Sequence, residues 1–154
     1  MMSKPCFPSE RPREDALLLS LDRLDQILTV DSAGREQEWA EAVGGALAGL
    51  EATLRRHRAA ARRPDGPLAE VDETRPTLAR QADELRSDLD DFLQQLLALR
   101  QQVRDTAEAY PSGSVDFAGI RQQAEQFLIG LHEKRETETK LVLESVNTDI
   151  GTGD

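Results

Sequence analysis

The sequence predicts an all-α protein, an up-down-up-down four-helix bundle, and three observations support this prediction. Apolar residues recur at alternating spacings of three and four in four separate segments, which is the period of one face of an α-helix. No segment alternates apolar and polar residues over a length typical of a strand. Strong helix formers (Ala, Leu, Glu, Gln and Arg) dominate the composition. At 154 residues, the chain has the length of one domain.

The first helix is predicted to begin at Pro12, because proline suits the first helical position. Glu14 and Asp15 then complement the positive end of the helix dipole. The apolar stripe of this helix comprises Leu17, Leu21, Leu24 and Leu28. Residues 1–12 hold three prolines and little apolar surface. They are therefore predicted to form a flexible lead-in to one bundle domain at 13–147.

The second helix is predicted from about residue 35 to 63, after a break at 31–34 that offers capping residues. Its apolar stripe comprises Trp39, Val43, Leu47, Leu50, Leu54, His57 and Ala61. Three glycines inside it, Gly44, Gly45 and Gly49, each weaken a helix by up to about 1 kcal/mol relative to alanine. We interpret them as positions where a neighbouring helix approaches closely.

The second half of the chain continues the pattern. Residues 64–67 (Pro-Asp-Gly-Pro) end the second helix, and Leu68 and Val71 are expected to enter the core from the connecting segment 68–75. The third helix begins at Pro76, with a stripe of Leu78, Ala82, Leu85, Leu89, Phe92, Leu96, Leu99 and Val103. After a loop at 110–114, the fourth helix has the stripe Ile120, Ala124, Phe127, Leu131, Val142 and Val146. Residues 148–154 are predicted to leave the helix as a flexible, glycine-rich tail.

Composition excludes several function classes. With 29 acidic and 19 basic residues, the net charge of −10 opposes binding to nucleic acid or to an anionic membrane surface. The start of the chain lacks the apolar stretch of a signal peptide, and no run approaches the roughly 20 apolar residues of a membrane helix. The single cysteine, Cys6, allows no intramolecular disulfide. We therefore expect a cytoplasmic protein.

Two histidines carry the candidate chemistry. His57 continues the apolar stripe of the second helix, and His132 lies at the edge of the fourth helix's stripe with Glu136 one turn later. A histidine and a carboxylate at this spacing present a nitrogen and an oxygen on one helix face. Bundles that bind two metal ions use such inward-facing groups from several helices.

These features resemble the hemerythrin-like (HHE cation-binding) family over about residues 14–154. The similar segments are 54–68, 76–89, the His-x-x-x-Glu spacing of His132 and Glu136, and the ending 148–154. Family members bind two bridged irons through histidines and carboxylates. Here the first helix has no histidine, Ala61 follows His57 where a carboxylate is expected, and Leu89 replaces the histidine of the third helix. The resemblance therefore implies a degenerate or absent di-iron site and no cofactor.

Three ligands remain for a metal site: His57, His132 and Glu136. They could hold one ion, as three ligands do in many catalytic zinc sites. The alternative function is thus a metal-binding sensor or oxygen-handling protein that takes iron, zinc or another divalent metal. The competing interpretations are a core-edge His57 hydrogen-bonded to a carbonyl or carboxylate, and a surface pair formed by His132 and Glu136.

A basic cluster at the end of the second helix is a candidate socket for an anion or an acidic partner. It comprises Arg55, Arg56, Arg58, Arg62 and Arg63. The simpler explanation is that cations complement the negative end of the helix dipole. The acidic cluster Asp83, Glu84, Asp88, Asp90 and Asp91 is interpreted as a solvated face.

The sequence favours a non-enzymatic binding or regulatory module. It has no glycine-rich phosphate loop, no paired cysteines and no convincing Ser–His–Asp set. A histidine phosphotransfer module is disfavoured, because His57 lacks the Lys-Gly pair of such modules and faces the apolar stripe. An adaptor whose third helix pairs with an unidentified protein partner or a second copy is a further alternative.

Overall fold

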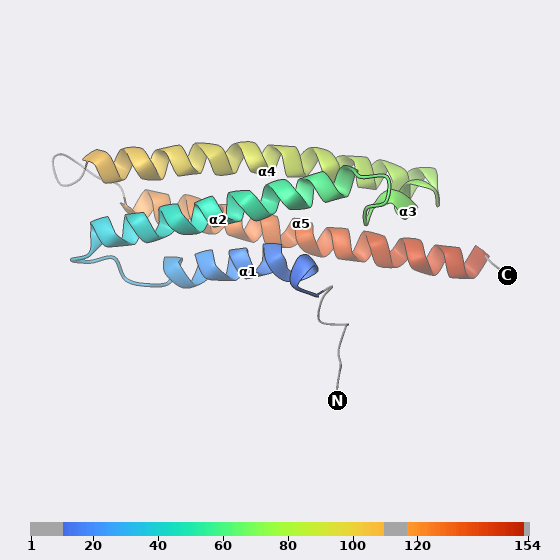
Figure 1. The fold of residues 1–154 in the computed structure, drawn as a ribbon, viewed down its shortest axis with the longest axis horizontal. Helices are drawn as coiled ribbons and strands as arrows, with labels where there is room; N and C mark the ends of the chain where they lie inside the picture. The colour runs from blue at the N-terminus through green and yellow to red at the C-terminus, as the bar shows by residue number, and fades with distance from the viewer. Residues whose placement is uncertain (1–10, 110–116, 153–154) are drawn as a thin grey trace, which may run out of the picture.

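The computed structural model describes residues 11–109 and 117–152. Within these ranges the protein is entirely helical and contains no strand. Figure 1 shows the long helices lying side by side in alternating directions. The helices are α1 (Arg11–Leu28), α2 (Glu36–Arg62), α3 (Ala69–Asp72), α4 (Pro76–Ala109) and α5 (Phe117–Thr152). None of the described helices is long and apolar enough to cross a membrane.

The helices follow the predicted order closely. The second helix, predicted at about 35–63, is Glu36–Arg62, and the third begins at Pro76 as expected. The connecting segment contains the short helix α3, which was not predicted. Leu68 and Val71 are fully buried, so the prediction that they enter the core is confirmed.

Two predicted boundaries were wrong. The first helix begins at Arg11, so Arg11 and Pro12 belong to α1 rather than to the lead-in. The last helix continues to Thr152, past the expected start of a tail at 148. Extending an existing helix adds one hydrogen bond per residue, so a single Gly151 weakens the helix without ending it. The predicted loop at 110–114 and most of the lead-in lie outside the described residues.

The long helices pack through their apolar stripes. Helix α1 packs on α2 and α5, α4 packs on the same two helices, and α3 packs on α4 and α5. The indole Nε1 of Trp39 donates to the carbonyl of Ile27 at 3.2 Å, and the hydroxyls of Thr53 and Ser20 are hydrogen-bonded at 3.1 Å. These contacts fix α1 antiparallel to α2. The largest fully buried side chains are Leu21, Leu24, Leu28, Leu47, Leu50, Leu54, Leu68, Leu78, Leu89, Leu96, Ile120 and Leu131.

The glycines of α2 do not permit close helix packing. A Cβ atom added at Gly44, Gly45 or Gly49 would meet no atom within 4 Å, so that interpretation was wrong. Among the described glycines, the severest overlap would arise at Gly66, in the turn after α2. A Cβ atom there would lie 2.0 Å from the carbonyl oxygen of Ala60, which is far inside van der Waals contact.

The lengths of the helices differ in a way that creates the candidate site. Helix α1 has 18 residues, whereas α2 has 27 and α5 has 36. Figure 1 shows α5 continuing well past the point where α1 begins. Helix α1 therefore covers only part of the furrow between α2 and α5.

Candidate functional site

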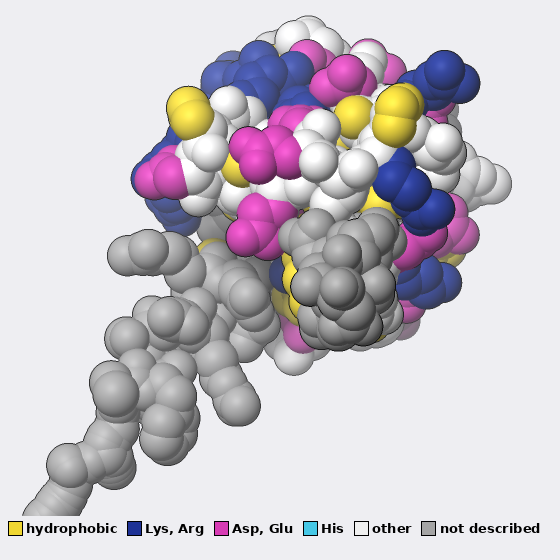
Figure 2. All heavy atoms as spheres, turned by 90° about the vertical axis from the view of Figure 1, so that its right-hand side faces the viewer, with side chains coloured by type: hydrophobic (Ala, Val, Ile, Leu, Met, Phe, Trp, Pro, Cys, Tyr) yellow, Lys and Arg dark blue, Asp and Glu magenta, His cyan; other side chains and the backbone are white. Residues whose placement is uncertain are grey.

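An open groove of about 490 Å³ lies between the end of α2 and the C-terminal half of α5. The bond between Ser20 and Thr53 sets the antiparallel register of α1 and α2, so the last residues of α2 lie level with the first residues of α1. Figure 1 shows α5 continuing past this level, so the groove extends along the part of α5 that α1 does not cover. It is lined by His57, Ala60, Pro67, Arg135, Glu138, Thr139, Val142, Leu143 and Val146. Figure 2 views this end of the molecule, where acidic and basic side chains intermingle with apolar ones.

The apolar part of the groove comes mainly from one face of α5. Val142, Leu143 and Val146 are three or four residues apart or adjacent, so they share one side of the helix. Leu143 is 59% exposed and Val146 is 38% exposed. Val146 was predicted to be part of the buried stripe, and it is exposed because α1 does not reach this level of α5. Exposed apolar groups on a folded chain are a feature of binding sites when they line a concave surface.

The polar part of the groove centres on a histidine–glutamate pair. Nε2 of His57 lies 2.6 Å from Oε1 of Glu138, and their side chains are only 16% and 4% exposed. A carboxylate buried this deeply requires a hydrogen-bonding partner, which the imidazole provides. The interpretation of His57 as a core-edge histidine hydrogen-bonded to a carboxylate is confirmed.

Arg135 lies one turn before Glu138 and has unused hydrogen-bonding capacity. Its Nη1 donates to the hydroxyl of Thr139 at 2.8 Å and lies 3.9 Å from Oε1 of Glu138. Its Nε is buried and has no hydrogen-bond partner among the described residues. The protein encloses this nitrogen, so Nε is not the part of the guanidinium that a ligand in the groove could contact.

The structure does not bring the three predicted metal ligands together. His57 is bonded to Glu138, His132 is partly buried, and Glu136 is exposed. Glu136 and Glu138 are two residues apart on α5, so they point in directions about 200° apart. Within residues 11–109 and 117–152, no three His, Cys, Asp or Glu side chains are close enough to hold a metal ion.

The basic cluster at the end of α2 is occupied by carboxylates of the same chain. Arg58 and Arg62 both pair with Asp90 of α4, and their hydrogen bonds lower the pKa of that carboxyl.

The neighbouring arginines are paired more locally. Arg55 lies 2.9 Å from Glu51, and Arg63 lies 3.2 Å from Asp65. Arg56, the fifth member of the cluster, is exposed. The predicted anion socket is therefore not an open one. The acidic cluster was also interpreted incompletely, since three of its members, Asp83, Asp88 and Asp90, form ion pairs.

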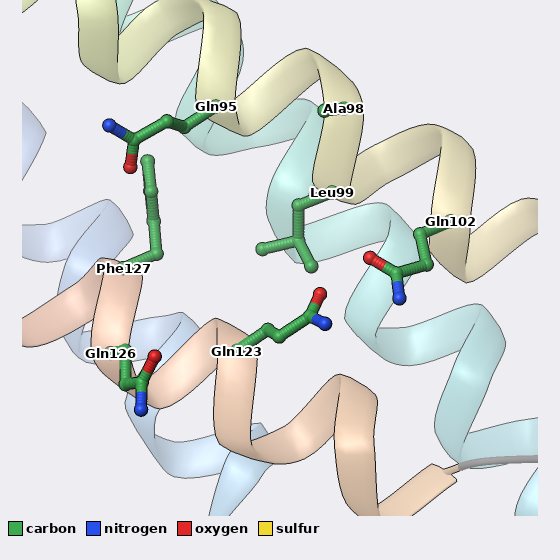
Figure 3. Close-up of a pocket in the computed structure, with 7 residues that line it drawn as sticks. All are labelled: Gln95, Ala98, Leu99, Gln102, Gln123, Gln126 and Phe127. Atoms are coloured by element: carbon green, nitrogen blue, oxygen red, sulfur yellow. The ribbon is translucent and has the colours of Figure 1, made fainter.

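A second groove of about 290 Å³ lies between α4 and α5 at another level of the molecule. Figure 3 shows four glutamines around an apolar floor of Leu99 and Phe127. No charged side chain among the described residues lines it, so these residues offer amide groups but no fixed charge for a ligand. The α2–α5 groove is larger and combines exposed apolar side chains with a guanidinium, which makes it the stronger candidate.

No protein-family model, curated protein or solved structure matches this chain. The resemblance to hemerythrin-like bundles therefore stays a prediction.

Sequence reasoning missed Glu138 and Arg135, although a signal was present. Glu138 is seven residues after Leu131, so it falls on the apolar stripe of α5. A carboxylate at a core position predicts a buried partner, and His57 occupies a core position on α2.

Proposed function

We propose that the chain is a non-enzymatic up-down-up-down four-helix bundle that serves as a binding module, with the α2–α5 groove as its ligand site. The cyclic packing of α1 on α2, α2 on α4, α4 on α5 and α5 on α1 supports the bundle arrangement. The observation that carries the binding function is the groove itself. It combines about 490 Å³ of open space, exposed Leu143 and Val146, and the guanidinium of Arg135 in its lining.

Binding is favoured over catalysis by the state of the groove's polar groups. The hydroxyl of Thr139 accepts from Arg135 and donates to the carbonyl oxygen of the same residue at 3.0 Å. His57 is bonded to Glu138 rather than to this hydroxyl, so the lining has no nucleophile activated by a base. The polar groups are arranged to orient a ligand and to keep the groove in shape.

A degenerate, hemerythrin-like metal site is part of the proposal as a hypothesis. It is supported by the position of His57 on α2 and by the order of the long helices. Leu89, which stands where the family resemblance expects a histidine, is buried in the core. A metal-binding function would require His57, His132 and Glu136 to converge on one ion. His132 and Glu136 share one face of α5, but His57 of α2 is bonded to Glu138 on another side of that helix, and this disfavours that alternative.

The test is binding of the dye 8-anilinonaphthalene-1-sulfonate, which carries an apolar body and one anionic group. We expect the tag-free protein to enhance the dye's fluorescence and Leu143→Lys to reduce this enhancement several-fold. The matched control is Ile129→Lys, because Ile129 is 58% exposed on the same helix but does not line the groove. Both variants are exposed-site changes that should leave the melting temperature nearly unchanged.

Two results would contradict the proposal. Equal dye fluorescence with Leu143→Lys and wild type would remove the groove as the binding site. Iron near two atoms per chain in the purified protein, measured by mass spectrometry, would restore the di-iron interpretation and require ligands beyond His57, His132 and Glu136.

A further inference from the structure

The groove continues a helix-binding surface that the protein already uses. Helix α1 lies in the furrow between α2 and α5 and packs on both. Beyond the beginning of α1, the same two helices flank open space lined by Ala60 of α2 and Val142 of α5. The shape of the furrow that fits a helix at one level therefore extends to the next level, where nothing in the described part of the chain fills it.

The length of the groove suits a short helix. Its lining on α5 runs from Arg135 to Val146. At a rise of about 1.5 Å per residue this is about 16 Å, the length of a helix of about three turns. Helix α1, with 18 residues, is of comparable size and shows that the furrow accepts such an element.

An extended peptide suits the groove less well than a helix. The walls are helices, whose backbone N–H and C=O groups are bonded within each helix. An extended chain lying on apolar side chains such as Val142 and Leu143 would leave its own backbone groups without partners. A helix satisfies these groups internally and presents only side chains to the groove.

Charge identifies one further feature of the occupant. Arg135 lines the groove, and the carboxylate that pairs with its Nη1 at 3.9 Å, that of Glu138, is bonded more closely to His57, at 2.6 Å. An acidic side chain on the occupant would pair with this guanidinium, and such charge-assisted hydrogen bonds are stronger than neutral ones. The occupant's other contacts would be apolar residues at helical spacing, facing Val142 and Val146.

The geometry points to an amphipathic helix of another protein as the occupant, lying end to end with α1 and placing an acidic side chain at Arg135. This inference rests on the proposed binding function and names the chemistry of the partner. It corresponds to the common mode in which an amphipathic helix inserts its apolar face into a groove.

The experiment uses a labelled synthetic peptide with the sequence of residues 14–30, because it contains the apolar stripe of α1 and several acidic residues. Fluorescence anisotropy measures its binding to the full chain. We expect saturable binding that Leu143→Lys weakens about tenfold and Ile129→Lys leaves unchanged. Arg135→Gln should weaken binding and reduce its dependence on salt, because one charge pair is lost.

The outcomes separate this inference from the proposed function. Peptide binding that is equal for wild type and Leu143→Lys would mean that the peptide exchanges with α1, and it would overturn the inference. Dye binding that responds to Leu143→Lys without any peptide binding would leave the groove as a site but exclude a helix as its occupant. A dimer in sedimentation experiments that Leu143→Lys dissociates would identify a second copy of the chain as the occupant instead. If neither the dye nor the peptide bound to the protein, the proposed binding function of the groove would be excluded as well.

Discussion

The furrow between α2 and α5 has two regions that differ in whether α1 covers them. In the covered region, Leu21 and Leu24 of α1 meet the same core as Leu47 and Leu50 of α2, and all four side chains are fully buried. In the open region, Leu143 is 59% exposed and the buried groups include the carboxylate of Glu138. One pair of helices therefore forms a leucine core at one level and an amphipathic groove at the next.

The difference shows how a bundle can create a binding site without a specialised loop. A helix that is shorter than its neighbours leaves the side chains opposite its missing turns uncovered. Such positions can hold a polar group that has a partner, as Glu138 does: its carboxylate is buried and bonded to His57. Where α1 is present, the same positions are restricted to residues such as Leu50, since an unpaired polar group in a closed core costs several kcal/mol.

The largest expected effect comes from removing a side chain in the covered region. Leu50→Ala should lower the free energy of unfolding by about 2–5 kcal/mol, because it leaves a cavity among leucines. Leu143→Ala in the open region should change it by less than about 0.5 kcal/mol. Urea denaturation monitored by circular dichroism measures both. Similar losses for the two variants would mean that the groove is covered in solution.

Breaking the buried pair of the open region should have the next largest effect. Glu138→Ala removes the acceptor of His57 and the nearest carboxylate to Arg135, so we expect a loss of about 2–4 kcal/mol. Glu136→Ala is the matched control, because Glu136 is an exposed carboxylate on the same helix. Its effect should stay within about 0.5 kcal/mol. If the two variants unfold at the same urea concentration, the pair between His57 and Glu138 does not form in solution.

Two glycines allow a comparison of backbone constraints in the two regions. Gly66→Ala, in the turn beside the groove, should destabilise the protein by about 1–3 kcal/mol, because the new Cβ would overlap the carbonyl oxygen of Ala60. Gly45→Ala in the middle of α2 should stabilise it by up to about 1 kcal/mol, because the space is open and alanine favours the helix. Thermal unfolding of both variants gives the signs. A destabilising Gly45→Ala would show that a neighbour approaches this face after all.

The sequence predicted the elements better than it predicted the site. Periodicity located the helices because stripes such as that of α4 repeat locally. Proline and glycine at 64–67 indicated the end of α2, and Pro76 indicated the start of α4. It could not separate Leu131, which is buried, from Val146, which is exposed, because both continue the same stripe. That distinction depends on where α1 begins relative to α5 in space.

Partners distant in the sequence were also beyond local pattern reasoning. Arg58 and Asp90 are separated by 32 residues, and His57 and Glu138 by 81. Each residue shows its type and its helix face in the sequence, but not which residue of another helix stands opposite. The intramolecular partners of the candidate arginine socket could not be foreseen for this reason, since the carboxylates that pair with four of its arginines come from α2, α4 and the following turn.

The smallest expected effect concerns the ion pairs that join α2 to α4 beside the open region. The hydrogen bond from Arg58 and then that from Arg62 lower the pKa of Asp90 below its ordinary value. A depressed carboxyl pKa stabilises the folded state above the unfolded-state pKa, and this contribution is lost as the pH falls through the folded-state pKa. Asp90→Asn should therefore destabilise the protein near neutral pH, by less than about 1 kcal/mol because these side chains are 38–40% exposed.

The difference between Asp90→Asn and wild type should shrink as the pH is lowered below about 4, where Asp90 of the unfolded chain becomes protonated, and it should be lost once the carboxyl is protonated in the folded state too. Urea denaturation at about pH 7 and about pH 3 measures it, with Asp91→Asn as the control for an exposed carboxylate on the next residue of α4. The effect should also weaken in high salt, which screens exposed charges. A difference that persists unchanged at low pH would show that Asp90 acts through packing rather than through its charge. The α2–α4 side of the open region would then be held together, like the covered region, by contacts that do not depend on ionisation.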